Sequence, residues 1–207
     1  MQTRQPATTG RFFAALMAIQ AIVLLWSAIN PHDYFTWFLE VVPVLIAAPL
    51  LVWWWPRFRF TPMVYALLAV HGVILMVGGH FTYAEVPYFD WLWDAMGASR
   101  NHYDRIGHFA QGFVPAMVLR ELLLRTSTLR GFWLPFLTIC FCLAFSALYE
   151  LIEWWTAAAM GESADSFLGS QGDIWDAQKD MMLALTGATL ALLTLSRAHN
   201  RALRGVV

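Results

Sequence analysis

Long apolar stretches alternate with short polar connections along the whole chain. A helix needs about 20 mainly apolar residues to cross the ~30 Å hydrocarbon core of a bilayer. Six segments have this length, although two of them do so only when polar positions are included. They cover residues 12–29, 34–55, 60–82, 104–124, 131–155 and 173–195. The pattern predicts an all-α, polytopic membrane helix bundle of about six transmembrane helices, formed by a single domain over residues 1–207.

The composition agrees with a protein that lies in a lipid bilayer. Hydrophobic residues make up 59% of the chain and charged residues 13%, about half of the ~25% that soluble domains carry. The surface therefore has to face something other than water. The formal net charge of −1 gives no support to a nucleic-acid partner.

The first apolar segment follows Arg4 and Arg11, as the core of a signal peptide would. Its apolar run is longer than a usual signal-peptide core, and the sequence SAINP that follows is a poor cleavage site. We therefore expect this segment to be retained as a transmembrane helix.

Lys and Arg concentrate in alternate connections. If six helices cross in turn, ten of the thirteen basic residues fall on one side. These are Arg4, Arg11, Arg57, Arg59, Arg120, Arg125, Arg130, Arg197, Arg201 and Arg204. The three on the other side are Arg100, Arg105 and Lys179. Because Lys and Arg are retained in cytoplasmic connections, the distribution supports six spans and predicts that both termini are cytoplasmic.

The acidic residues show the opposite distribution. Of the fourteen Asp and Glu residues, only Glu121 falls at the cytoplasmic end of a segment. The positive-inside rule does not require this, since Asp and Glu contribute little to topology. The acids on the outer side therefore need a separate explanation.

The last segment carries three of these acids on one helical face. Asp173, Asp176 and Asp180 follow one another at i, i+3 and i+7. The apolar part after them, residues 181–195, is too short to cross the membrane alone. The helix must therefore begin in polar sequence, which places Asp180 and Asp176 below the membrane surface. Carboxylates at such a depth usually face the bundle interior and have a partner.

Three other segments bring polar residues to the same depth. Asp104 and His108 share one face of the fourth segment, and Glu150 and Glu153 lie near the outer end of the fifth. The third segment ends close to His80. The sequence therefore predicts a cluster of carboxylates and imidazoles at the outer ends of four helices.

Such a cluster is typical of a metal site. Helix bundles build metal sites from Glu, Asp and His side chains that project inward from facing helices. Mixed carboxylate and imidazole ligands suit a divalent ion such as Zn, Mn, Mg or Fe. The predicted metal ligands are His80, His108, Glu150, Glu153, Asp176 and Asp180. Glu150 and Asp173 are the candidate catalytic carboxylates.

Simpler interpretations compete for several of these side chains. Asp104 and Asp173 could cap or stabilise helix N-termini. Arg105 and Lys179 could pair with acids on neighbouring helices and so lock the helices together. His71, in the middle of the third segment, is more typical of a neutral hydrogen-bonded histidine than of a ligand.

Other polar residues fit the cluster less well. Glu40 lies about 9 Å below the outer end of the second segment, which makes it a weaker candidate. Asp90, Asp94, Glu162 and Asp165 are expected to be solvated loop charges.

Four long runs resemble the YjdF family of bacterial inner-membrane proteins. They are GGHFTYAEVP, SRNHYDRIGHFAQGFVPA, SALYELIEWW and LGSQGDIWDAQKDMMLALTGA. The similarity covers most of residues 20–200. It implies a multi-pass protein of the bacterial cytoplasmic (inner) membrane, and it implies no particular reaction.

A more distant similarity is to VanZ-like membrane proteins. Their Asp-Lys-x-x-His motif is similar to Asp104, Arg105 and His108, with Arg in place of Lys. In the later motifs of that pattern, Glu153 stands in place of Gln and Asp180 in place of Asn. These departures make the present chain more acidic than the VanZ-like pattern.

The cluster predicts a metal-dependent hydrolase or transferase that acts on a lipid-linked substrate, because a bound metal lowers the pKa of its water. No Ser or Cys nucleophile motif accompanies the cluster, which disfavours a covalent acyl mechanism. One alternative is a non-catalytic envelope protein whose polar cluster locks the helices. Another is a proton- or cation-coupled transporter, although the sequence shows no inverted repeat.

Overall fold

A computed structural model describes residues 7–87, 101–160 and 171–205. Within these ranges the chain forms six α-helices and one short 3-10 helix, and no strand. They are α1 (Ala7–Ser27), α2 (Tyr34–Trp54), α3 (Pro62–Phe81), η1 (Tyr83–Glu85), α5 (Tyr103–Thr126), α6 (Trp133–Met160) and α8 (Asp176–Leu203). The predicted helical membrane bundle is therefore confirmed. The loop charges Asp90, Asp94, Glu162 and Asp165 lie outside the described residues, as do Arg4 and Arg100.

Five of the helices, α1, α2, α3, α6 and α8, are long and apolar enough to cross a membrane. The exception is α5, although its 24 residues would extend about 36 Å. Half of these residues are buried, among them Asp104, His108, Arg120 and Glu121. Because α5 packs against α3, α6 and α8, its polar side chains face protein instead of lipid.

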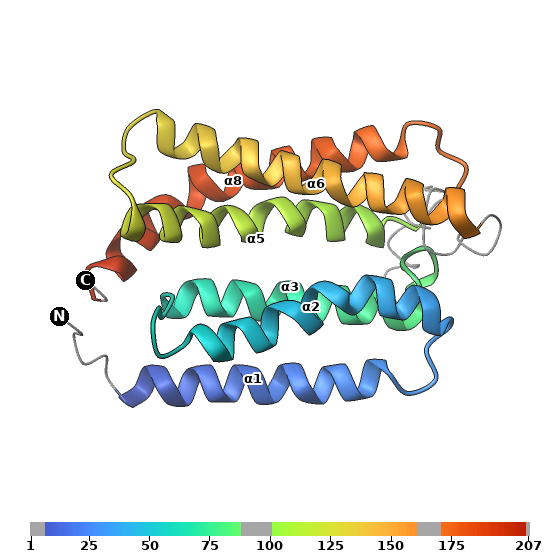
Figure 1. Ribbon diagram of the computed structural model, residues 1–207, viewed down its shortest axis with the longest axis horizontal. Helices are drawn as coiled ribbons and strands as arrows, with labels where there is room; N and C mark the ends of the chain where they lie inside the picture. The colour runs from blue at the N-terminus through green and yellow to red at the C-terminus, as the bar shows by residue number, and fades with distance from the viewer. Residues whose placement is uncertain (1–6, 88–100, 161–170, 206–207) are drawn as a thin grey trace.

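The helices form two groups of three (Figure 1). In one group α3 contacts both α1 and α2, and in the other α5, α6 and α8 contact one another. The contact between α3 and α5 joins the two groups.

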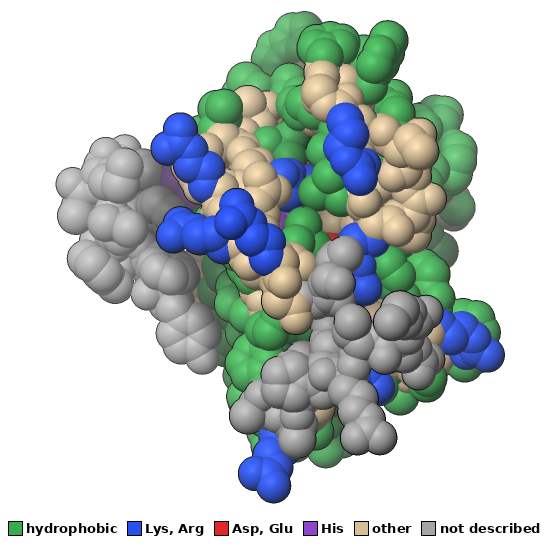
Figure 2. Space-filling model, turned by 90° about the vertical axis from the view of Figure 1, so that its left-hand side faces the viewer, with side chains coloured by type: hydrophobic (Ala, Val, Ile, Leu, Met, Phe, Trp, Pro, Cys, Tyr) green, Lys and Arg blue, Asp and Glu red, His purple; other side chains and the backbone are tan. Residues whose placement is uncertain are grey.

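The bundle has two chemically different ends. The start of α1 and the end of α8 lie at the same end (Figure 1), together with the α2–α3 and α5–α6 connections. We call this the arginine end, and Figure 2 shows the Lys and Arg side chains that surround it. The described basic residues there are Arg11, Arg57, Arg59, Arg120, Arg125, Arg130, Arg197, Arg201 and Arg204. We call the opposite end, where α6 ends and α8 begins, the acidic end.

The helix boundaries follow from capping chemistry. The Thr36 backbone N–H donates to Asp33 Oδ1 at 2.7 Å and caps α2, an interaction that lowers the pKa of Asp33. The predicted start of the last helix at Asp173 is wrong by one turn. The Asp173 side chain accepts from the Trp175 N–H at 3.1 Å, which forms a turn before the helix begins at Asp176. The helix gains its length at the other end, where it continues to Leu203.

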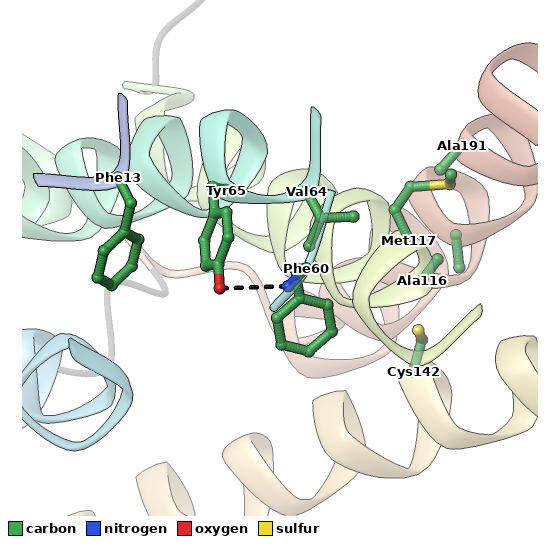
Figure 3. Close-up of a cluster of buried hydrophobic side chains, with 9 residues drawn as sticks. Phe13, Phe60, Val64, Tyr65, Ala116, Met117, Cys142 and Ala191 are labelled. Atoms are coloured by element: carbon green, nitrogen blue, oxygen red, sulfur yellow. Dashed lines mark hydrogen bonds between the residues drawn. The ribbon is translucent and has the colours of Figure 1, made fainter. Parts of the chain in front are cut away.

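An apolar core fills the half of the bundle nearer the arginine end (Figure 3). Phe13 of α1 stacks on Trp55 and contacts Tyr65 of α3. Met117 of α5 and Cys142 of α6 complete this core and are fully buried. All these helices therefore meet in one core, and the polar groups described below lie on either side of it.

The contact between α5 and α8 is made at the level of the backbone. A Cβ atom at Gly112 would lie 1.8 Å from the carbonyl oxygen of Ala184, and one at Gly187 would lie 2.2 Å from that of Phe109. Small residues allow this approach, and they are typical of helix contacts in membranes. Ala116 and Ala188 continue the contact toward the arginine end and are fully buried.

We expect Gly112→Ala to destabilise the protein, because a methyl group at this position requires α5 and α8 to separate. Overpacking of this kind costs about 1–3 kcal/mol or more. Thermal unfolding in detergent, followed by scanning fluorimetry, measures the effect. Gly10→Ala in α1 is the matched control, since nothing lies within 4 Å of a Cβ atom there. Equal unfolding temperatures for the two variants would contradict the close contact.

Candidate functional site

Acidic and imidazole side chains from three helices meet at the acidic end of the bundle. Asp104 and His108 come from α5, Glu150 and Glu153 from α6, and Asp180 from α8. They form two overlapping sets of three, Asp104–His108–Asp180 and His108–Glu150–Glu153. In each set the potential ligand atoms lie within 4.8 Å of one another. We call these five residues the His108 cluster.

His108 lies at the centre of the cluster and is buried. Its Nδ1 atom lies 3.0 Å from Gln111 Oε1, and its Nε2 atom lies 3.3 Å from Asp104 Oδ1. The amide oxygen can only accept, so this contact places a proton on Nδ1. In the neutral ring, Nε2 is then the nitrogen that can bind a metal, beside Asp104 and Asp180.

Glu150 approaches His108 from α6. Its Oε1 atom lies 3.7 Å from His108 Nδ1, and it has no hydrogen-bond partner among the described residues. Only 9% of the Glu150 side chain is exposed. A buried carboxylate oxygen without a hydrogen bond is costly in a folded protein, so this atom indicates a position where a ligand is expected.

The two aspartates of α8 differ in position. Asp180 belongs to the first set of three and is 2% exposed. Asp176, one turn earlier, is also buried and interacts electrostatically with Glu150, but it belongs to neither set of three ligands. The structure thus brings four of the six predicted metal ligands together, adds Asp104, and places Asp176 beside them.

Asp173 and His80 lie apart from the cluster. Asp173 forms ion pairs with Lys179 and, at 3.7 Å, with Arg105 Nη2. The His80 ring packs against Trp26, and its Nδ1 atom lies 3.0 Å from the Ser27 carbonyl oxygen. Neither residue belongs to the sets of potential metal ligands. The structure therefore adds no support for a catalytic Asp173 or a metal-binding His80.

A cavity of about 40 Å³ adjoins the cluster. Its walls include Asp104, His108 and Glu153 from the cluster, and also Glu40 of α2 and His71 of α3. These last two residues are the ones that sequence reasoning ranked low. Each is an isolated polar residue within an apolar run, so no spacing pattern connected it with the cluster.

Two tyrosines complete the polar wall of this cavity. Tyr83 of η1 is buried, and burial raises the pKa of its phenol well above the usual range. Its hydroxyl group interacts with Glu40, which lines the same cavity. The Tyr149 hydroxyl donates to the Leu39 carbonyl oxygen at 3.4 Å, which ties α6 to α2.

A second polar group, at the arginine end, is a closed network around Glu121. The Glu121 side chain is fully buried and accepts hydrogen bonds from the Thr61 backbone N–H and hydroxyl and from Arg125 Nη1. Arg120 Nη1 donates to His199 Nδ1 at 2.8 Å, so the neutral His199 ring donates from Nε2 to Glu121 at 3.0 Å. This network joins the start of α3 to the ends of α5 and α8. Sequence reasoning missed it, because its members are far apart in the chain.

The fold and the cluster together define a class. The chain is a polytopic helical membrane protein with a buried carboxylate and histidine cluster near one end of its bundle.

Comparison with known proteins identifies the family. Residues 12–201 match the family described as "Predicted membrane protein (DUF2238)", and the chain belongs to that family. The chain is 50% identical to the inner membrane protein YjdF of Escherichia coli (strain K12) over 184 aligned residues. These residues make up 88% of each of the two chains. The resemblance to the YjdF family, and with it a multi-pass inner-membrane protein, is therefore confirmed. No solved structure matches this chain.

We expect Glu121→Ala to lower the stability of the protein by about 3–5 kcal/mol, because it leaves buried His199 and Arg125 without their carboxylate. Chemical unfolding in mixed micelles measures the loss. Glu85→Ala is the matched control. It also removes a carboxylate from a histidine pair, since Glu85 lies 3.3 Å from His32, but both of those side chains are about half exposed. An exposed pair contributes about 0–1 kcal/mol. Similar losses for the two variants would contradict a structural role for the Glu121 network.

Proposed function

We propose that the His108 cluster binds a divalent metal ion, and that the chain is a metal-dependent hydrolase or transferase acting on a lipid-linked substrate. The observation that carries this proposal is the convergence of Asp104, His108 and Asp180 close to a Glu150 oxygen that accepts no hydrogen bond from the described residues. Three protein ligands with room for water are typical of catalytic metal sites.

The residues divide naturally into ligands and an acid–base group. Asp104, the Nε2 atom of His108 and Asp180 would hold the ion, which would be Zn, Mn, Mg or Fe according to this ligand set. Gln111 would fix the ring through Nδ1, as outer partners of metal-bound histidines do. Glu150 lies on the Nδ1 side of the ring, away from this position of the ion, and it would act as the acid–base group of the site through an intervening water molecule.

The cluster cannot enclose a large substrate. The adjoining cavity of about 40 Å³ has room for about two or three water molecules, and a lipid headgroup is much larger. A lipid-linked group would therefore reach the metal from the acidic end of the bundle. Because the bilayer surrounds the helices, the lipid part of such a substrate could remain in the membrane beside the protein.

A second candidate function is a proton- or cation-coupled carrier. The observation that favours it is the position of His71, near the middle of α3, in the wall of the same cavity. Polar groups at this depth are typical of ion and proton pathways.

We also propose that both termini are cytoplasmic, so that the His108 cluster opens toward the periplasm. The positive-inside rule supports this orientation, because the arginine end carries the start of α1 and the end of α8.

Reporter fusions test the orientation. A fluorescent protein that folds only in the cytoplasm should fluoresce when fused after Val207, and alkaline phosphatase fused there should be inactive. Alkaline phosphatase fused after Glu85, at the acidic end, should be active. The reverse pattern would overturn the orientation.

We expect the wild-type protein to bind about one equivalent of Mn²⁺ or Zn²⁺ and to unfold at a higher temperature with the metal, because binding to the folded state alone stabilises it. Asp180→Asn and His108→Ala each remove a proposed ligand and should weaken metal binding. Loss of a residue that only hydrogen-bonds to a ligand weakens binding about 10–100-fold, so we expect a loss of this size or larger. Isothermal titration calorimetry and thermal unfolding measure both effects without a known substrate.

Asp173→Asn is the matched control for this experiment. It removes a carboxylate at the same end of the bundle, but one that pairs with Arg105 and Lys179 outside the cluster. It should bind the metal as the wild type does. No binding by the wild type, or equal binding by Asp180→Asn, would leave the non-catalytic interpretation, in which the cluster only locks α5, α6 and α8.

A further inference from the structure

We propose that the cavity beside the His108 cluster is a water-binding site, which holds a short chain of ordered water between the cluster and His71 in the middle of α3. This inference goes beyond the proposed metal-dependent activity. It concerns α2 and α3 as much as the cluster, and it does not depend on whether a metal binds.

The cavity lies where the two groups of helices face each other. Its walls come from α2, α3, η1, α5 and α6, whereas the His108 cluster belongs to α5, α6 and α8. Its volume of about 40 Å³ is several times the minimum that one water molecule needs. A polar cavity of this size is expected to be hydrated, while an apolar one stays dry.

His71 supplies the polar group farthest from the acidic end. It is the tenth residue of the twenty in α3, so it lies about 15 Å from either end of the helix. Its Nε2 atom is buried and has no hydrogen-bond partner among the described residues. A buried ring nitrogen in this state is normally satisfied by an ordered water. His71 borders the cavity, where such a water can lie.

Glu40 provides the next polar group of the wall. It is buried and interacts with Tyr83, Asp104 and His108. A water molecule that binds His71 therefore has further polar groups within the same cavity. The titratable side chains that line it are Glu40, His71, Tyr83, Asp104, His108, Tyr149 and Glu153.

The water chain ends at His71 because the bundle is closed beyond it. One to two turns closer to the arginine end, Val64 and Tyr65 of α3 are almost completely buried. They pack with Met117 of α5 in the apolar core shown in Figure 3. The cavity therefore does not continue toward the arginine end, and its other polar groups lie on the side of the His108 cluster.

The consequence is a supply of water, and of the protons that water can carry, to a site enclosed by the membrane. A hydrolytic metal centre consumes one water molecule for each bond that it cleaves. In a carrier, the same water would connect a group in the middle of the membrane with the solution at the acidic end. The water site thus serves either of the functions considered above.

Radiolytic hydroxyl labelling of the metal-free, full-length protein in nanodiscs tests this inference, with the labelled residues identified by mass spectrometry. Radicals formed from bound water modify the side chains next to that water. Leu75 borders the cavity, and Leu148 of α6, 46% exposed, faces lipid next to Tyr149. We expect Leu75 to be labelled several-fold more than Leu148. Equal labelling of the two leucines would overturn the inference.

Two substitutions of His71 show what holds the water. His71→Asn keeps a polar group and should preserve the labelling of Leu75. His71→Leu should lower it several-fold, because the water next to Leu75, one turn further along α3, loses the polar group that holds it there. Unchanged labelling in the His71→Leu protein would contradict the role of His71. Since no metal is present in the experiment, its outcome is independent of whether the His108 cluster binds one.

Discussion

The polar chemistry of this protein depends on the backbone contact between α5 and α8. The two helices run parallel, and Gly112 meets Ala184. One turn back from this contact, His108 of α5 and Asp180 of α8 occupy equivalent positions, and another turn back so do Asp104 and Asp176. Side chains four residues apart share one face of a helix. The close approach at Gly112 therefore determines that the imidazole of one helix lies beside the carboxylates of the other.

The same two helices carry both polar groups of the bundle, and the contrast between the groups is informative. At the arginine end, hydrogen bonds satisfy the Glu121 carboxylate from several directions. At the acidic end, a buried Glu150 oxygen has no hydrogen bond in the described part of the chain. Natural proteins usually satisfy their buried polar groups, and exceptions concentrate at functional sites. We therefore assign a structural role to the first group, and the contrast supports the binding role that we propose for the second.

Much of this arrangement could be predicted from the sequence, for different physical reasons. Hydropathy alone located four helices, and two more qualified only when polar positions were included. The Arg distribution supported the count of six. The polar residues of one of these two helices, α5, are tolerated because it packs inside the bundle. Depth in the membrane, inferred from the length of apolar runs, identified Glu150, Glu153 and Asp180. Depth does not determine the direction in which a side chain points. His80 lies at the expected end of α3 but packs against Trp26, and Glu40 reaches the cavity through packing that no local pattern encodes.

The position of the cluster also restricts the chemistry that it can perform. Five of its neighbours in the cavity wall are titratable or polar, yet the space between them admits only a few water molecules. The reacting group of a substrate must therefore be small or must approach from the acidic end, where α6 ends and α8 begins. The apolar core around Tyr65 and Met117 closes the opposite direction. The hydrolytic reaction that we propose fits these restrictions, because its second substrate is water and the cluster lies near one end of the bundle.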